Sequence, residues 1–303
     1  MSFANRGRST WKLKSRSLEL GEKTLVMGVL NVTPDSFSDG GLFIERAAAV
    51  DHALAMIEAG ADMIDIGGES TRPGSYEPVT ADEEMARVVP VIEDVLRQKP
   101  ETVISIDTYK SETAVAAIAA GAEIVNDISG FLWDDNMAAA CAELQCGVVL
   151  MHTRGRPGEW KHLPRLNSEE VLPLVKRELG ERLGAATGAG VERERIVLDP
   201  GFGFGKAFEN NYPLLLQFDE LRALGQPLLA GVSRKSFLTR TLASLYGDGK
   251  VPTEALETAS VAAMVACILN GADVVRVHSV RAAVEAARIT DAILKNGMSE
   301  ETP

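Results

Sequence analysis

Cysteine is scarce in this chain of 303 residues, and long apolar runs are absent. The three cysteines, Cys141, Cys146 and Cys267, are odd in number and lack the C-x-x-C spacing of redox and metal-binding motifs. Such a set fits a reducing compartment, so we expect a cytoplasmic protein. Since no apolar run approaches the ~18 residues that a membrane span needs, we expect no membrane partner.

Basic residues are outnumbered, with 31 lysines and arginines against 43 acidic residues and a net charge of −12. This balance argues against nucleic acid or an anionic membrane as the main partner. The one basic stretch lies near the N-terminus and contains Arg6, Arg8, Lys12, Lys14 and Arg16. It lacks the apolar core of a signal peptide. We interpret it as an exposed arm that leads into a small hairpin at "WKLKSRSLELGEKT", residues 11–24.

Several catalytic motifs are missing as well. The absence of a G-x-S-x-G elbow and of an H-x-x-x-H cluster argues against covalent catalysis and against a tightly held transition metal. The glycine-rich "GFGFGK" at 201–206 does not match a phosphate loop, because Ala207 follows the lysine. We interpret its glycines as positions where the backbone lies close to a flat ligand.

What the chain does contain is a repeated helix–strand unit. Segments 59–68, 120–129 and 270–279 each pass from a helix-ending glycine through an acidic residue to a β-branched run. Strands are expected at 24–30, 62–66, 102–107, 123–128, 147–151, 195–199, 227–232 and 273–278. Helical periodicity occurs at 45–59, 81–98, 110–120, 135–145, 168–187, 210–224, 254–269 and 280–295. This alternation predicts an α/β fold of the (β/α)8 TIM-barrel type, with a doubly wound open sheet as the alternative.

The chain reads as one domain. Its length alone suggests two, yet α/β barrels of this size form a single domain, and no linker rich in Pro, Gly or Ser divides the sequence. We expect an N-terminal arm and hairpin at 1–22, the barrel at 23–296 and a short tail at 297–303.

Polar residues follow almost every predicted strand, which is where a barrel places its functional groups. They are Asn31, 67–75, Asp107, Asn126, 151–157, 199–206, 233–236 and 276–278. Residues i and i+2 of a strand share a face, so Arg276 points the same way as His278. The same rule joins Ser105 to Asp107, Val197 to Asp199 and Ser233 to Lys235. Because such groups are costly to bury in an apolar core, their convergence predicts a site at the barrel mouth.

Each of these residues also has a structural interpretation when it is taken alone. Asp107 is equally suited to cap the helix that begins near Lys110, and Asn126 is equally suited to a turn. A single lysine such as Lys235 usually lies at the surface, and a single histidine such as His278 is usually structural. The prediction of a site therefore depends on their convergence.

The expected mouth combines two kinds of chemistry. Its cations are Arg72, Arg234 or Lys235, Arg276 and His278. Positive charge gathered in an acidic protein predicts a bound anionic group, with phosphate the leading candidate. The carboxylates and amide of Asp107, Asn126 and Asp199 suit a flat heterocycle rich in N–H donors.

Seven motifs resemble the dihydropteroate synthase family of pterin-binding enzymes in order and spacing. They are "MGVLNVTPDSFSDGG", "IDIGGESTRPG", "ISIDT", "NDISG", "LDPGFGFGK", "GVSRKS" and "RVH", and the match runs from about residue 25 to 290. The resemblance implies a (β/α)8 barrel, usually a homodimer. It also implies an enzyme that joins 6-hydroxymethyl-7,8-dihydropterin diphosphate to p-aminobenzoate, giving 7,8-dihydropteroate and pyrophosphate.

The resemblance further implies how the substrates are held. Asp107, Asn126, Asp199 and Lys235 are expected to bind the dihydropterin ring. Asp107, Asp199, Lys235, Arg276 and His278 are the expected catalytic residues. The "NVTPDSFSDGG" loop, residues 31–41, is expected to close over the diphosphate, with Asn31 at a Mg²⁺ ion. Thr71, Arg72, Phe202, Ser236, Arg276, Val277 and His278 are expected to contact the diphosphate or p-aminobenzoate.

Two positions depart from the usual family pattern, and neither carries an assigned role. Ser279 follows His278 where an Asp is common, and "ALETAS" at 255–260 lacks a frequent glycine. We hypothesise a dissociative reaction in which pyrophosphate leaves before the aniline nitrogen attacks, since no nucleophile is evident. The alternatives are a non-catalytic pterin-binding paralogue and a methyltetrahydrofolate-corrinoid methyltransferase. Asp65 and Glu69 have no assigned role.

Overall fold

The computed structural model describes residues 6–33, 42–70, 78–247 and 249–297, except for the side chains of 42–45. Within these ranges, eight parallel strands form one sheet in the order β8-β7-β6-β5-β4-β3-β10-β9. They are β3 (Leu25–Asn31), β4 (Met63–Gly67), β5 (Val103–Asp107), β6 (Ile124–Asp127), β7 (Gly147–Met151), β8 (Ile196–Asp199), β9 (Leu229–Ala230) and β10 (Val274–Val277). Each strand lies within about two residues of its predicted position.

The sheet closes on itself between β8 and the chain that leads into β9. A parallel bridge joins Leu198 to Leu228, and the backbone N–H of Leu198 donates to Pro227 O at 3.0 Å. The first barrel strand, β3, pairs with the last, β10. This closure confirms the predicted (β/α)8 barrel, and the alternative of an open doubly wound sheet is wrong.

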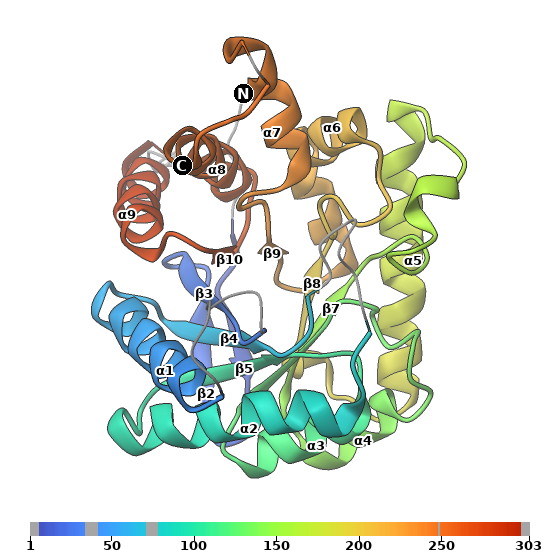
Figure 1. Ribbon diagram of the computed structural model, residues 1–303. Helices are drawn as coiled ribbons and strands as arrows, with labels where there is room; N and C mark the ends of the chain where they lie inside the picture. The colour runs from blue at the N-terminus through green and yellow to red at the C-terminus, as the bar shows by residue number, and fades with distance from the viewer. Residues whose placement is uncertain (1–5, 34–41, 71–77, 248, 298–303) are drawn as a thin grey trace.

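Helices surround the strands on all sides in Figure 1. They are α1 (Leu42–Glu58), α2 (Ala81–Gln98), α3 (Ser111–Ala119), α4 (Met137–Leu144), α5 (Ser168–Gly188), α6 (Asn211–Leu216), α7 (Ser236–Leu242), α8 (Thr253–Leu269) and α9 (Val280–Gly297). Short 3₁₀ turns lie at Trp160–His162, Arg193–Arg195, Phe208–Asn210, Phe218–Leu224 and Ala243–Leu245. In the part of the chain described, no helix is both long enough and apolar enough to cross a membrane.

Two details of the helix pattern differ from the prediction. The single helix expected at 210–224 ends at Leu216, and a 3₁₀ stretch follows because Gln217 leaves the helical region at φ −108°, ψ 27°. Helix α7 was not expected at all. It spans two turns, buries only Phe237 and Leu238, and has no side-chain cap at Lys235, so it carries neither a long periodic pattern nor a start signal.

Side chains alternate between two cores, as the strand period requires. Outward residues such as Ile64, Ile66 and Ile104 pack against the helices in one apolar cluster. Inward residues at the beginnings of the strands, such as Met63 and Val103, form a second apolar cluster inside the barrel. The interior of the barrel is therefore apolar where the strands begin, and its polar groups lie where the strands end.

An N-terminal hairpin closes the apolar end of the barrel. Strands β1 (Ser9–Lys12) and β2 (Ser17–Leu20) pair antiparallel, as the expected hairpin requires. Trp11, Leu13 and Leu20 are buried in the inner cluster, and the Trp11 indole N–H donates to Arg195 O at 2.8 Å. The hairpin thus acts as a plug, because the open end of the barrel offers apolar area that water would otherwise contact.

The interpretation of the basic stretch as an exposed arm is wrong for Arg6. Its guanidinium is buried and donates to Thr24 Oγ1 at 2.7 Å, to Ala272 O at 3.0 Å and to Asp291 Oδ1 at 2.6 Å. These partners come from both ends of the chain, so the arm joins the first barrel strand to helix α9.

We expect Trp11→Ala to lower the free energy of unfolding by about 3–5 kcal/mol, because it leaves a cavity in the inner cluster. Urea unfolding measures the change. Thr10→Ala, at the exposed neighbouring position, is the matched control and should cost no more than about 0.5 kcal/mol. If Trp11→Ala lowered the free energy of unfolding no more than the control does, Trp11 would not stabilise the barrel as proposed.

Candidate active site

A cavity of about 480 Å³ opens at the carboxyl ends of the strands. Its wall includes residues from β3, β5, β6, β7, β8 and β10 and from the loops that follow β4, β8, β9 and β10. Among the residues singled out in the sequence, Asn31, Asp107, Asn126, Asp199, Arg234, Lys235, Ser236, Arg276 and His278 all line it. The expected convergence of strand-end residues at one mouth is therefore found in the structure.

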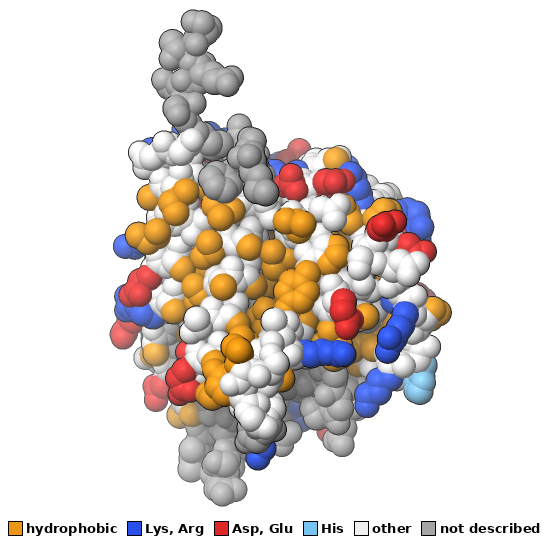
Figure 2. All heavy atoms as spheres, turned by 90° about the horizontal axis from the view of Figure 1, so that it is seen from above, with side chains coloured by type: hydrophobic (Ala, Val, Ile, Leu, Met, Phe, Trp, Pro, Cys, Tyr) orange, Lys and Arg blue, Asp and Glu red, His pale blue; other side chains and the backbone are white. Residues whose placement is uncertain are grey.

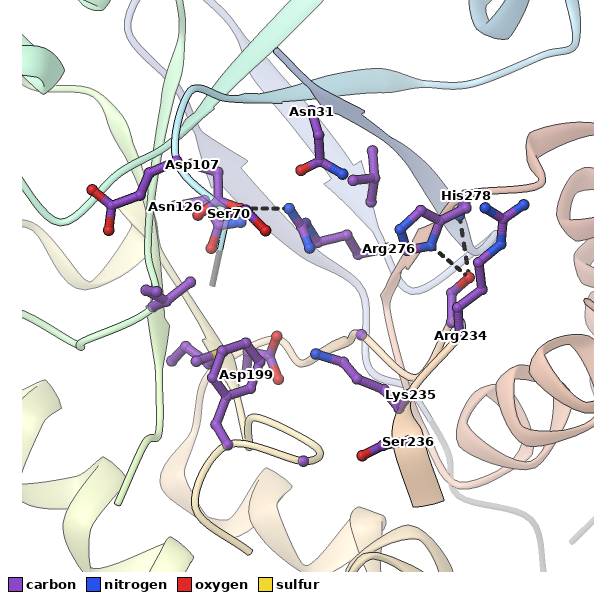
Figure 3. A pocket seen from close by; sticks show the side chains of 18 of the residues that line it. Asn31, Ser70, Asp107, Asn126, Asp199, Arg234, Lys235, Ser236, Arg276 and His278 are labelled. Carbon is purple, nitrogen blue, oxygen red and sulfur yellow. Dashed lines mark hydrogen bonds and ion pairs between the residues drawn. The ribbon is translucent and has the colours of Figure 1, made fainter. Parts of the chain in front are cut away.

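Arg276 extends across the floor of this cavity between two carboxylates. Its Nε donates to Asp65 Oδ2 and its Nη2 to Asp107 Oδ2, both at 2.6 Å. Asn126 Nδ2 donates to the same Asp65 oxygen at 3.0 Å. Figure 3 shows Arg276 pointing at Asp107, with Asn126 beside that pair. Because these bonds use the side chain of Asp107, its alternative role as a helix cap is wrong, and Lys110 occupies the cap position of α3.

Asp199 and Lys235 face each other on the opposite side of the cavity in Figure 3. The Asp199 carboxylate accepts from the backbone N–H of Gly201 at 2.7 Å, which fixes one of its oxygens. The Lys235 ammonium lies 4.0 Å from the centre of the Phe204 ring, a cation–π contact. The Phe204 and Trp160 rings pack edge to face, with their centres 5.4 Å apart. Both aromatic residues line the cavity.

Burial dominates the electrostatics of these groups. It raises the pKa of Asp107 to about 7, although the positive charge of Arg276 opposes the shift. Burial also raises the pKa of Asp199, and there the hydrogen bond from the Gly201 N–H opposes it. Burial lowers the pKa of Lys235 to about 8, with Arg276 adding to the effect. For Arg276 burial opposes the charge, but the carboxylates of Asp65 and Asp107 outweigh it and raise the pKa.

The Lys235 side of the mouth is held in place by helix α8. Arg234 has φ of 54°, which is strained for a residue other than glycine. Its backbone N–H donates to Ser260 Oγ at 2.9 Å and its Nη2 to Glu257 Oε1 at 2.8 Å. Beyond it, Ser233 Oγ lies 3.0 Å from His278 Nδ1 and accepts from the His278 backbone N–H at 3.2 Å. The ends of β9 and β10 are thereby tied together.

Two residues expected at the site lie elsewhere. Phe202 is fully buried and stacks on Phe218 at 6.1 Å, behind the cavity wall. Phe204, two positions later, lines the cavity instead. Val277 is buried in the outer apolar cluster, because it points away from Arg276 and His278 as strand alternation dictates.

The "GFGFGK" loop is held by its own lysine. Lys206 is buried and donates to three carbonyl oxygens, Gly201 at 2.7 Å, His152 at 3.3 Å and Phe204 at 3.4 Å. Gly201 has φ of 65°, and a Cβ there would lie 2.0 Å from His152 O, so only glycine fits. Lys206 therefore binds backbone, and Gly203 and Phe204 line the cavity.

Sequence reasoning gave no individual role to Phe204, Trp160, Glu69 or Asp65, although Glu69 and Phe204 lie in segments expected at the mouth. Glu69 and Trp160 line the cavity, and Asp65 anchors Arg276. Asp65 had a usable signal, because a charged residue in the middle of the buried run "MIDIG" has to face the barrel interior. Thr71, Arg72 and residues 34–41 of the expected lid lie outside the described residues.

Asn31 is the residue that was expected at a metal ion, and its amide lines the cavity at the end of β3. In the described ranges, no group of three His, Cys, Asp or Glu side chains is arranged to hold a metal.

Comparisons with known proteins agree on one family. The family model described as "Pterin binding enzyme" matches residues 27–278. The dihydropteroate synthase of Clostridium beijerinckii is 43% identical over 94% of this chain and 99% of its own length. A structure of the Xanthomonas albilineans dihydropteroate synthase with 4-aminobenzoic acid superposes with a TM-score of 0.84 at 41% identity, covering 95% of this chain and 98% of that one. A second structure from this organism, in complex with 7,8-dihydropteroate, superposes with a TM-score of 0.80 at 38% identity. It covers 94% of this chain and 98% of that one.

We expect Asp107→Asn to stabilise the protein more at pH 8 than at pH 5, by on the order of 2 kcal/mol. The pKa of Asp107 is higher in the folded than in the unfolded state, so the folded state holds the proton more tightly. Stability from this group is therefore lost as the pH rises from about 4 to about 7. Urea unfolding at both pH values measures the difference. Asp135→Asn, at an exposed position, is the control, and an equal effect of Asp107→Asn at both pH values would contradict the prediction.

Proposed function

The chain belongs to the dihydropteroate synthases of the pterin-binding family, and we propose that the cavity at its barrel mouth holds both substrates of that reaction. The enzyme transfers the pterinylmethyl group of 6-hydroxymethyl-7,8-dihydropterin diphosphate to p-aminobenzoate, giving 7,8-dihydropteroate and pyrophosphate. One observation supports the location above all. The carboxylates of Asp107 and Asp199 and the amide of Asn126 lie in the same cavity whose rim carries cations.

In this proposal the dihydropterin ring lies against Asp107, Asn126, Asp199 and Lys235. A pterin edge carries several N–H donors and few competing charges, so carboxylate and amide oxygens fixed in advance are well matched to it. Arg276 bonds to Asp107 at 2.6 Å, which supports a rigid acceptor rather than a side chain that must be ordered by substrate. Phe204 and Trp160 supply the apolar wall on which an aromatic ring packs.

The anionic groups are assigned to the cationic part of the cavity. Arg276 and His278 face the diphosphate, while Arg234, Lys235 and Ser236 face the benzoate. Asn31 offers an amide oxygen that fits Mg²⁺, since this ion keeps several waters and takes its other ligands from phosphate. Bound Mg²⁺ would neutralise charge on the leaving group. The roles proposed for Thr71 and Arg72 depend on the family resemblance alone.

We propose that pyrophosphate departs before the new bond forms. Departure leaves positive charge on the exocyclic methylene and the ring, and the carboxylates of Asp107 and Asp199 stabilise that charge in a pocket of low dielectric. Arg276 and His278 compensate the charge of the leaving group. The weakly basic aniline nitrogen then attacks the methylene, and no protein nucleophile takes part.

We also propose that the protein works as a cytoplasmic homodimer. Free, buried cysteines support a reducing location. Large apolar side chains are exposed on α6, α9 and the 3₁₀ turn that follows α7, namely Leu216, Leu245, Ile289 and Ile293. Figure 2, which looks down on the α6–α9 side of the barrel, shows hydrophobic atoms gathered over that face. Such a patch supports a contact between two copies of the chain.

Pyrophosphate release from the purified protein, given dihydropterin diphosphate and Mg²⁺, tests the proposed function. We expect 7,8-dihydropteroate only when p-aminobenzoate is added, and slow pyrophosphate release without it. Asp107→Asn should reduce that release at least tenfold even without p-aminobenzoate, because the cation loses a carboxylate. Tight pterin binding without turnover would instead favour a non-catalytic paralogue, and unchanged release by Asp107→Asn would count against the dissociative course.

The proposed dimer is tested by introducing charge into the apolar face. We expect the double variant Ile289→Glu/Ile293→Glu to sediment as a monomer, because four buried carboxylates per dimer are costly to desolvate. The matched control is Arg177→Gln/Glu181→Gln on the exposed side of α5, which should remain dimeric. A wild-type protein that sediments as a monomer would rule the dimer out.

A further inference from the structure

A second polar network lies beside the cavity, and no role has been given to it so far. It is built from two carboxylates, Glu69 after β4 and Glu84 in α2, with the Lys110 ammonium between them. Lys110 Nζ donates to Glu69 Oε2 at 2.6 Å and to Glu84 Oε2 at 3.1 Å. The three side chains are only 4%, 1% and 14% exposed for Glu69, Glu84 and Lys110. One cation is thus shared by two buried anions.

The two carboxylates have different surroundings. Glu84 accepts hydroxyl bonds from Thr108 at 3.0 Å and Thr113 at 2.9 Å, so it belongs to the interior. Glu69 lines the cavity itself. Its Oε1 accepts from the Tyr109 hydroxyl at 3.0 Å and its Oε2 from the backbone N–H of Val79 at 3.2 Å. Glu69 therefore fixes the cavity wall and ties position 69 to position 79.

A carboxylate in this wall is unexpected on electrostatic grounds. Both substrates of the proposed function are anions, and a negative charge close to them in a desolvated site would weaken their binding. Lys110 reduces this repulsion, because its ammonium contacts the Glu69 carboxylate directly. The same ammonium lies 4.4 Å from the centre of the Tyr109 ring.

We propose that Lys110 is a positioning residue that masks the charge of Glu69, so that this wall can be rigid without repelling the diphosphate and the benzoate. The inference depends on the proposed function, since it concerns the charge of those substrates. A purely structural salt bridge would stabilise the wall for every ligand alike. Charge masking instead affects anionic ligands selectively, and this difference can be measured.

Lys110→Met keeps the length of the side chain and removes its charge. We expect it to bind dihydropterin diphosphate at least tenfold more weakly than the wild type in isothermal titration calorimetry. Binding of uncharged 6-hydroxymethylpterin should change less than twofold, and the KM for p-aminobenzoate should rise. Lys110→Arg, which keeps the charge, should retain most of the diphosphate affinity. The matched control is Lys12→Met, which breaks the exposed pair with Glu192 and should change neither affinity.

Two further variants keep the proposal falsifiable if Lys110→Met folds poorly. Glu69→Gln leaves Lys110 with one carboxylate fewer, so it should bind the diphosphate at least as tightly as the wild type. Lys110→Met/Glu69→Gln removes both charges and should recover the affinity to within about threefold. Weaker diphosphate binding by Glu69→Gln, or an equal loss for both pterins in Lys110→Met, would overturn the proposal.

Failure of the proposed function gives a different result. In that case the wild-type protein itself would neither bind dihydropterin diphosphate nor release pyrophosphate, whatever residue stands at 110. Wild-type turnover combined with normal diphosphate binding by Lys110→Met would overturn only the inference about Lys110.

Discussion

The mostly buried guanidinium of Arg276 is the group around which the polar half of the barrel is arranged. A cation in the interior needs compensation, and Asp65 and Asp107 supply it from β4 and β5 at 2.6 Å each. Removing Arg276 would leave both carboxylates without their cation. The same Asp65 oxygen accepts from Asn126, so the bonds that stabilise Arg276 also orient the amide on the cavity floor. A ligand therefore meets groups whose positions the protein has already set.

The barrel divides its two ends between stability and chemistry. At one end, Trp11 and Leu20 of the hairpin seal an apolar cluster made by the beginnings of the strands. At the other end, burial pushes the pKa values of Asp107 and Lys235 towards neutrality, to about 7 and about 8. Groups held in such environments cost folding free energy. The apolar end and the outer layer of helices offset that cost, because they bury most of the hydrophobic area.

Much of this arrangement was predictable from the sequence, because the relevant signals are local. Strand alternation placed Arg276 and His278 on one face, and the helix–strand repeat identified the barrel. The same alternation puts Val277 on the other face, against the role that the family resemblance implied for it. The contacts that escaped prediction join residues far apart in the chain. Trp11 bonds to the carbonyl of Arg195, which no local pattern reveals. The choice between Phe202 and Phe204 was equally hidden, since both have the same spacing from glycine and only packing distinguishes them.

The plug also determines the order in which the chain can complete its structure. Its hairpin is synthesised before the barrel strands, yet Trp11 needs the carbonyl of Arg195, and Arg6 needs Ala272 and Asp291. Strand β3 likewise has to wait for β10 before its second edge is paired. During synthesis the apolar face of the hairpin therefore lacks part of its partner surface until the last barrel strands have emerged. Long-range pairing of this kind generally slows folding, because distant segments have to meet before they stabilise one another.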